Sequence, residues 1–251
     1  MTRTPGPLVP SVAETLKHPA FPTAIWNLEP DRKGLVPVAK GRGGPINISW
    51  EIHGSGPVKL VLIMGLGALK SAWQRQTLHF GHEQHTRYSV LLIDNRGMGD
   101  SDKPLMRYST SEMALDIAEV LAHPPPYIEN TTTFAENMAQ RASMLLPKQS
   151  TARGEMHKRL DRSRFGIKGF LLQLIAAGWH HKSRAQLEAM AEQVGRERIL
   201  VMHGTQDRMI SLPHGEKLIE FLRPGRAVVV RRWGTRRLWN GVSGLMGWWR
   251  R

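Results

Sequence analysis

Three histidines at a regular spacing are the first candidates in this chain for residues with a chemical function. The segment HFGHEQH places His79, His82 and His85 three residues apart, and imidazole nitrogens are common metal ligands. Gly81 interrupts the helix that would carry them, so a solvated helix end explains the spacing better, and we expect no metal site. The absence of cysteine excludes disulfides, thiolate metal ligands and cysteine nucleophiles.

Glycine-rich segments do not support phosphate binding. The chain has no G-x-x-x-x-G-K-[ST] segment, and its GRGG segment at 41–44 does not follow a predicted strand. We therefore expect no cofactor.

Two short apolar runs, 59–64 and 88–93, begin the framework that would position a site. Both are rich in Val, Ile and Leu and both end at a glycine-rich turn, with a short helix expected between them at 71–79. This order predicts two buried parallel strands joined by a helical crossover. Before them, INISWEIH at 46–53 alternates apolar and polar side chains, which predicts an antiparallel strand.

The rest of the chain is predicted to be largely helical, with two further strands. The helix expected at 110–123 can be capped by Ser109, Thr110 or Ser111, and three prolines end it. Further helices are expected at 134–145, 168–177, 183–194 and 214–222, and strands at 198–202 and 227–230.

Three turns of this framework resemble those of the α/β-hydrolase family. They are Gly65-Leu66-Gly67, the segment DNRGMGDS at 94–101, and HGTQD at 203–207. The resemblance implies an α/β fold class, with a mostly parallel sheet and a helical cap. It also implies the chemistry of the family, in which a Ser, an acid and a His from separate turns cleave esters or similar acyl bonds.

The resemblance gives two residues expected catalytic roles. The N–H of Leu66 would be an oxyanion donor, although an ordinary strand-to-helix turn would need the same flanking glycines. Asp207 stands at the position of the acid that orients the histidine. Asp94 and Arg96 are expected to hold their loop through hydrogen bonds and an ion pair, without chemistry of their own.

The nucleophile and the base of the family have no match in this chain. No serine has glycine at both −2 and +2, so the G-x-S-x-G turn is absent, and no histidine follows the last predicted strand. Where the turn would belong, between His123 and Ile128, only PPPY remains. We therefore expect the chain not to hydrolyse esters.

The missing segment also changes the expected fold. In the family the strands around the nucleophile are central, between those predicted here at 59–64 and 198–202. We expect the two halves of the sheet to lack ladder partners, with a strained core or an unstable product. An internal loss followed by a terminal segment of Arg, Trp and Gly resembles a splice variant or a misread gene model.

The expected organisation has five parts. These are an irregular proline-rich arm (1–45), the N-terminal half of the hydrolase core (46–123), a helical cap-like region (127–195), the C-terminal part of the core (196–230) and a basic Arg/Trp tail (231–251).

The net charge of +14 is concentrated near the end of the sequence. Residues 223–251 hold eight Arg and no Asp or Glu, which leaves +6 for the preceding 222 residues. We therefore expect no specific nucleic-acid partner. Arg and Trp in 231–251 favour weak affinity for polyanions. The alternative to the hydrolase interpretation is a non-enzymatic protein that binds an anionic membrane or nucleic acid through this tail.

The family resemblance implies a small apolar ester-like substrate as the partner. No apolar run approaches the roughly 18 residues that a transmembrane helix needs, and no signal-peptide pattern is seen. A cytoplasmic protein is the default expectation.

Overall fold

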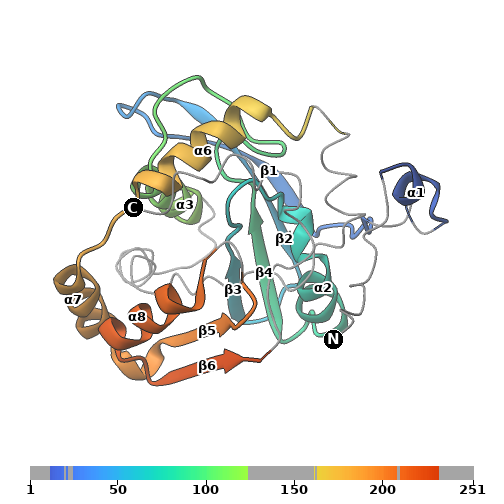
Figure 1. The fold of residues 1–251 in the computed structure, drawn as a ribbon. Coiled ribbons are helices and arrows are strands. Elements are labelled where there is room, and N and C mark those ends of the chain that lie inside the picture. Colours follow the sequence, from blue (N-terminus) through green and yellow to red (C-terminus); the bar gives the residue numbers. More distant parts are fainter. Residues whose placement is uncertain are drawn as a thin grey trace, which may run out of the picture.

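The computed structural model of this chain describes residues 12–19, 21, 25–123, 161, 163–207 and 210–231. The helix expected at 134–145 and the tail beyond Arg231 lie outside the described residues. Figure 1 shows the elements, which in chain order are α1 Val12–Lys17, β1 Arg32–Val38, β2 Ile46–His53, β3 Val58–Leu62, η1 Lys70–Trp73, α2 Gln74–Gln76, η2 Thr77–Glu83, β4 Tyr88–Ile93, α3 Thr110–Ala122, α6 Ile167–Trp179, α7 Arg184–Val194, η3 Arg196–Arg198, β5 Leu200–Gly204, α8 Leu212–Leu222 and β6 Arg226–Val230.

The first sheet contains four strands in the order β1-β2-β4-β3. Strands β1 and β4 run antiparallel to β2, whereas β3 runs parallel to β4, with Val58 opposite Tyr88 and Leu62 opposite Leu92. The chain passes from β3 to β4 through η1, α2 and η2, which are a 3-10 turn, an α turn and a π turn in succession. The predicted parallel pair and its helical crossover are therefore confirmed.

Both faces of this sheet are covered. Because side chains alternate along a strand, Leu91 and Ile93 of β4 face one side while Val90 and Leu92 face the other. The first side packs against Ile117, Val120 and Leu121 of α3, and the second against Trp73 of η1. Helix α3 begins where expected, since Ser109 accepts a hydrogen bond from the N–H of Glu112.

Helices α6 and α7 precede the second sheet. The expected helices at 168–177 and 183–194 are confirmed, each within a few residues. Ser183 and Gln186 form a reciprocal capping box at the start of α7. Among the described residues, no helix combines the length and the apolar character that crossing a membrane requires.

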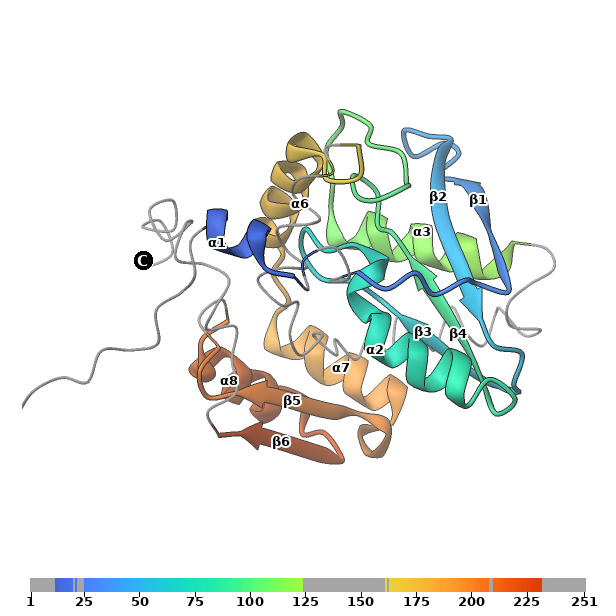
Figure 2. The same ribbon diagram turned by 90° about the vertical axis from the view of Figure 1, so that its right-hand side faces the viewer.

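The second sheet is the parallel pair β5 and β6, joined by α8. Figures 1 and 2 both place this pair at one end of the molecule. Its core cluster contains Ala191 of α7, Val201 of β5 and Leu222 of α8. In the described part of the chain no strand joins β3 to β5, so the two sheets are separate. Among the described residues the sheet is thus interrupted between β3 and β5, as the sequence predicts.

Strand β1 corrects one expectation. Irregular backbone was expected throughout 1–45, but β1 pairs along its whole length with β2, from Arg32 opposite Ile52 to Val38 opposite Ile46. Pro37 is tolerated because β1 is an edge strand, on whose outer side a missing N–H breaks no ladder bond. Pairing with β2 therefore outweighs the local proline signal.

Candidate functional site

The predicted oxyanion turn, 65–67, directly follows β3 and lies against α6. Gly67 has a φ of 64°, in the left-handed region that favours glycine, and a Cβ there would lie 2.5 Å from the ring of Phe170. The N–H of Gly67 donates to Oε1 of Gln173 at 3.0 Å, and Nε2 of the same amide donates to the Arg96 carbonyl at 2.8 Å. One buried glutamine of α6 therefore holds together the turn 65–67 and the loop 94–101, which are called the motif loops below.

Asp94 and Lys70 form the polar centre beneath this turn. Asp94 accepts hydrogen bonds from the backbone N–H and from Nζ of Lys70, at 2.8 and 2.9 Å. Lys70 is only 4% exposed, and its Nζ also contacts Ser49 Oγ at 2.9 Å, Asp100 at 2.9 Å and Glu51 at 3.3 Å. Burial lowers the pKa of Lys70, but the charges of Asp94 and Glu51 outweigh it, so the net shift is upward. The ammonium therefore stays charged and neutralises its carboxylate neighbours.

Asp100 extends this network to the segment before α6. Its two oxygens accept from Nε and Nη2 of Arg164 at 2.8 and 2.6 Å. The hydrogen bond from Arg164, with a further contribution from Lys70, holds the pKa of Asp100 well below its usual range. The backbone N–H of Gly99 also donates to the Arg164 carbonyl at 2.8 Å. Loop 94–101 and the start of α6 are thus joined by charged and by backbone contacts.

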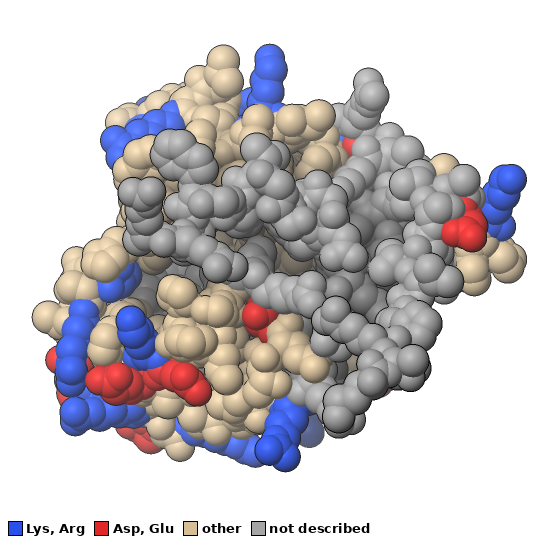
Figure 3. Space-filling model, viewed as in Figure 1, with Lys and Arg blue, Asp and Glu red and all other residues tan. Residues whose placement is uncertain are grey.

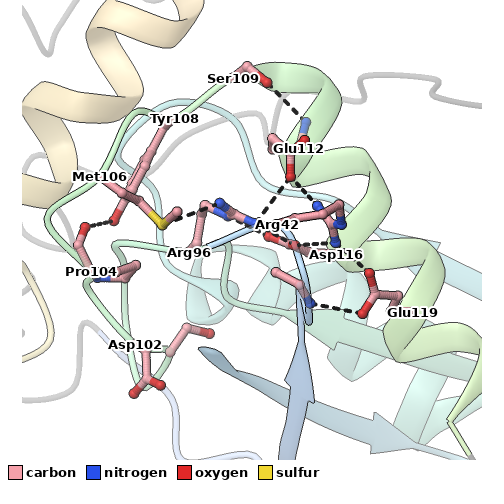
Figure 4. Close-up of polar contacts among 12 residues, drawn as sticks. Arg42, Arg96, Asp102, Pro104, Met106, Tyr108, Ser109, Glu112, Asp116 and Glu119 are labelled. Carbon is pink, nitrogen blue, oxygen red and sulfur yellow. Dashed lines mark hydrogen bonds and ion pairs between the residues drawn. The ribbon is translucent and has the colours of Figure 1, made fainter. Parts of the chain in front are cut away.

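Arg96 fixes the other side of the same loop (Figure 4). Its Nε and Nη2 donate to the two oxygens of Asp116 on α3, each at 2.6 Å. Arg42 also contacts Asp116, at 3.2 Å, and pairs with Glu112 and Glu119 of the same helix. Two arginines and three carboxylates therefore anchor α3 to the sheet. The expected structural roles of Asp94 and Arg96 are confirmed.

Asp207, the predicted acid, is half-buried in the turn after β5. Its Oδ1 accepts the N–H of Ile210 at 3.1 Å, and its own N–H donates to the Gly204 carbonyl at 3.1 Å. These contacts shape the turn that leads into α8. Leu66, the predicted oxyanion donor, is half-buried in the turn after β3. The two predicted site residues thus follow strands of different sheets.

The regularly spaced histidines turn toward different partners. His79 Nδ1 lies 3.0 Å from Glu83, whereas Nε2 of His82 lies 3.0 Å from Nδ1 of His53 on β2. Burial, followed by the nearby His53, lowers the pKa of His82, which favours the neutral form of the His82 ring. Within the described ranges, no three His, Cys, Asp or Glu side chains converge on a possible metal position.

A Ser–His pair that the sequence patterns do not single out lies at the start of α8. Ser211 Oγ and His214 Nδ1 are 2.8 Å apart, and both residues are exposed. A serine next to an imidazole is the arrangement of an activated nucleophile. In the catalytic triad, however, the serine contacts Nε2 and the acid contacts Nδ1. Here the serine occupies the nitrogen that the acid would need. The only sequence signal for the pair is its spacing of three residues at a helix start.

Comparison with known proteins adds a short sequence match. No family model matches the chain. Over 79 residues the chain is 34% identical to the putative carbamate hydrolase RutD of Azorhizobium caulinodans. The match covers 32% of this chain and 28% of that relative, so less than a third of the relative's length is represented.

The solved structures give a far more extensive match. An esterase from Exiguobacterium antarcticum aligns with a TM-score of 0.57 and 18% identity, over 81% of this chain and 92% of the esterase. A bromoperoxidase from Bacillus anthracis aligns with a TM-score of 0.56 and 17% identity, over 81% and 92%. A thermophilic esterase from Thermogutta terrifontis gives 0.56 and 17%, over 81% and 91%.

The chain has the α/β-hydrolase fold. Identities this low establish the architecture alone, so any activity of the chain must be argued from its own residues. The α/β-hydrolase fold that the sequence predicts is thereby confirmed.

Proposed function

We propose that this chain is a catalytically silent α/β-hydrolase, related to esterases that act on acyl bonds of small apolar substrates. Support comes from the fold, together with the resemblance of the turn of Leu66 and the turn of Asp207 to those that hold the oxyanion donor and the acid in the family. The observation that carries the proposal is the lack of a G-x-S-x-G serine anywhere in the sequence, together with the lack of any histidine after His214.

The missing groups give an expected size for the loss of ester-hydrolysis rate. In serine hydrolases without the triad, only the oxyanion hole and substrate binding remain, a residual acceleration of about 10³–10⁴ over water. Loss of one oxyanion donor removes a further ~3–4 kcal/mol of transition-state stabilisation. The N–H of Gly67 is already bonded to Gln173, so it is not an available second donor. These two losses together leave a rate close to that of the uncatalysed reaction, so turnover of an ester should be hard to distinguish from the background.

The test is hydrolysis of p-nitrophenyl butyrate by the full chain, alongside Asp207→Ala and Ser211→Ala. We expect the three proteins to release p-nitrophenol at the same rate as a heat-inactivated sample. A fluorophosphonate probe, which labels activated serines, should leave all three unmodified.

Two outcomes would overturn the proposal. Turnover that disappears in Asp207→Ala would show that Asp207 still serves a working triad. Labelling or turnover that disappears in Ser211→Ala would instead assign the chemistry to the pair of Ser211 and His214.

A further inference from the structure

Helix α6 has one face against the protein and one apolar face open to solvent. Gly169, Gln173 and Ala176 are buried on the inner face. At 3.6 residues per turn, positions four apart lie on neighbouring parts of one side. The outer face carries large apolar side chains with this spacing, which are Ile167 at 68% exposure, Leu171 at 48%, Ile175 at 50% and Trp179 at 78%. Contiguous exposed apolar residues of this kind indicate an interaction surface.

The charged residues of the segment that carries this face all have one sign. From 162 to 187 the sequence contains no Asp or Glu. Two arginines of that stretch are already paired, Arg164 with Asp100 and Arg184 with Glu188 and Glu220. The described lysines are Lys168 at the start of the helix and Lys182 beyond its end, and these are the cations that the face offers to a partner. In Figure 3 acidic and basic side chains lie together over α7 and α8, whereas the upper part, where α6 lies in Figure 1, shows mainly uncharged and basic atoms.

The helix is held by contacts at both ends, so this face is formed in the folded protein. At its start Arg164 pairs with Asp100 through two contacts of 2.8 and 2.6 Å. At its end His180 Nδ1 lies 2.5 Å from Thr110 Oγ1 at the start of α3. Between them Gln173 binds both motif loops. No ordering of α6 is needed before a partner can bind.

We propose that the outer face of α6 docks the protein onto an anionic lipid surface. Leucine and isoleucine side chains in the acyl boundary, a tryptophan at the headgroup level and flanking cations are what an interfacial helix presents to such a membrane. A second copy of the chain fits less well. Symmetric pairing through this face would bring basic ends together without a single acidic partner from 162 to 187.

The test is flotation of the full chain with vesicles of phosphatidylcholine alone and with added phosphatidylglycerol. We expect binding only to the anionic vesicles, weakening as salt is raised. The double variant Leu171→Gln and Ile175→Gln should reduce the partition coefficient about tenfold or more, since each change removes one inserted aliphatic side chain. The matched control is Leu115→Gln, at an exposed leucine of α3, and it should bind as the parent does.

Binding by the basic tail is separated from binding by α6 because every variant keeps residues 231–251. If the folded double variant, checked by circular dichroism, floats as well as the parent, the α6 proposal is wrong. It is also wrong if the parent shows no binding to anionic vesicles. A dimer seen by light scattering, which the double variant converts to a monomer, would then assign this face to a second copy of the chain. Lys168→Gln with Lys182→Gln should weaken binding several-fold, and Lys217→Gln on α8 should not.

Discussion

Lys70 is the residue on which the charge balance beneath the motif loops depends. Its ammonium is nearly inaccessible and touches Asp94, Asp100 and Glu51, and Asp94 is itself 1% exposed. A buried carboxylate that loses its cation keeps the full cost of desolvation. Replacement of Lys70 therefore affects the fold far more than an exposed lysine would.

We expect Lys70→Met to lower the free energy of unfolding by about 3–5 kcal/mol, because the apolar chain fills the space but leaves Asp94 unpaired. Urea unfolding followed by circular dichroism measures the change. Lys33→Met, at an exposed position of β1, is the matched control and should stay within about 0.5 kcal/mol of the parent. Equal effects of the two substitutions would contradict the assigned role of Lys70.

The sequence predicts some of these residue roles and not others. Asp94 and Arg96 belong to a recognisable turn, so their structural function is predictable. Their partners are not, because Lys70 and Asp116 approach them from helical segments 24 and 20 residues away in the sequence. Gln173 is more distant still, at 106 residues from Gly67. No local pattern marks a glutamine whose partners are defined only by the packing of α6.

At the scale of elements, α6 and the 94–101 loop approach so closely that only glycine fits between them. A Cβ added to Gly169 would lie 2.0 Å from the carbonyl oxygen of Gly97, a backbone atom that cannot turn aside. Gly178 lies on the same helix with nothing within 4 Å of an added Cβ. The helix thus contains its own control for the effect of an added methyl group.

Gly169→Ala should displace α6 and lower the free energy of unfolding by at least about 1–3 kcal/mol, the usual cost of overpacking. Gly178→Ala should be neutral or stabilise by up to about 1 kcal/mol, because alanine favours the helix. Thermal unfolding compares the two proteins, and hydrogen exchange of α6 reports its docking. A Gly169→Ala protein as stable as Gly178→Ala would show that α6 does not pack tightly on the loop.

Elements with local signals are predicted well, and those that depend on distant partners are not. Ser109 and Ser183 mark helix starts because capping is decided within three residues. Strand β1 carries Pro37 and Gly34, which argue against a strand, and only its register with β2 defines it. The π turn of η2 likewise has no signal in the sequence. Its Gly81 lies close to the Cβ of His53 on β2, a contact that only the packing of η2 on the sheet defines.

Considered as a whole, the molecule has cores of unequal size. The cluster between the first sheet and α3 contains eleven described buried residues, whereas that between β5 and its two helices contains three. The clusters share no residue, and the sheets are separate. Cooperative units of a protein follow its contiguous cores, so the second sheet should open more easily than the first.

Native-state hydrogen exchange should therefore show two levels of protection. We expect amides of β4 to open with the highest free energy, and those of β5 and β6 to open at a value lower by at least about 2 kcal/mol. Mass spectrometry of peptides covering 88–93 and 200–204 makes the comparison in one sample. Identical opening free energies in the two peptides would mean that the chain unfolds as one unit despite its interrupted sheet.

The side-chain amide of Gln173 would couple the docking of α6 to the binding of a ligand at the N–H of Gly67. Its oxygen occupies the N–H of Gly67 as long as α6 is docked, so a carbonyl or anion that binds there must first displace it. Ligand at the turn and helix on the turn are therefore competitors, and linkage makes the competition reciprocal. Any contact that tightens α6, including the proposed adsorption of its outer face, would lower the apparent affinity of such a ligand in proportion to the fraction of molecules left open.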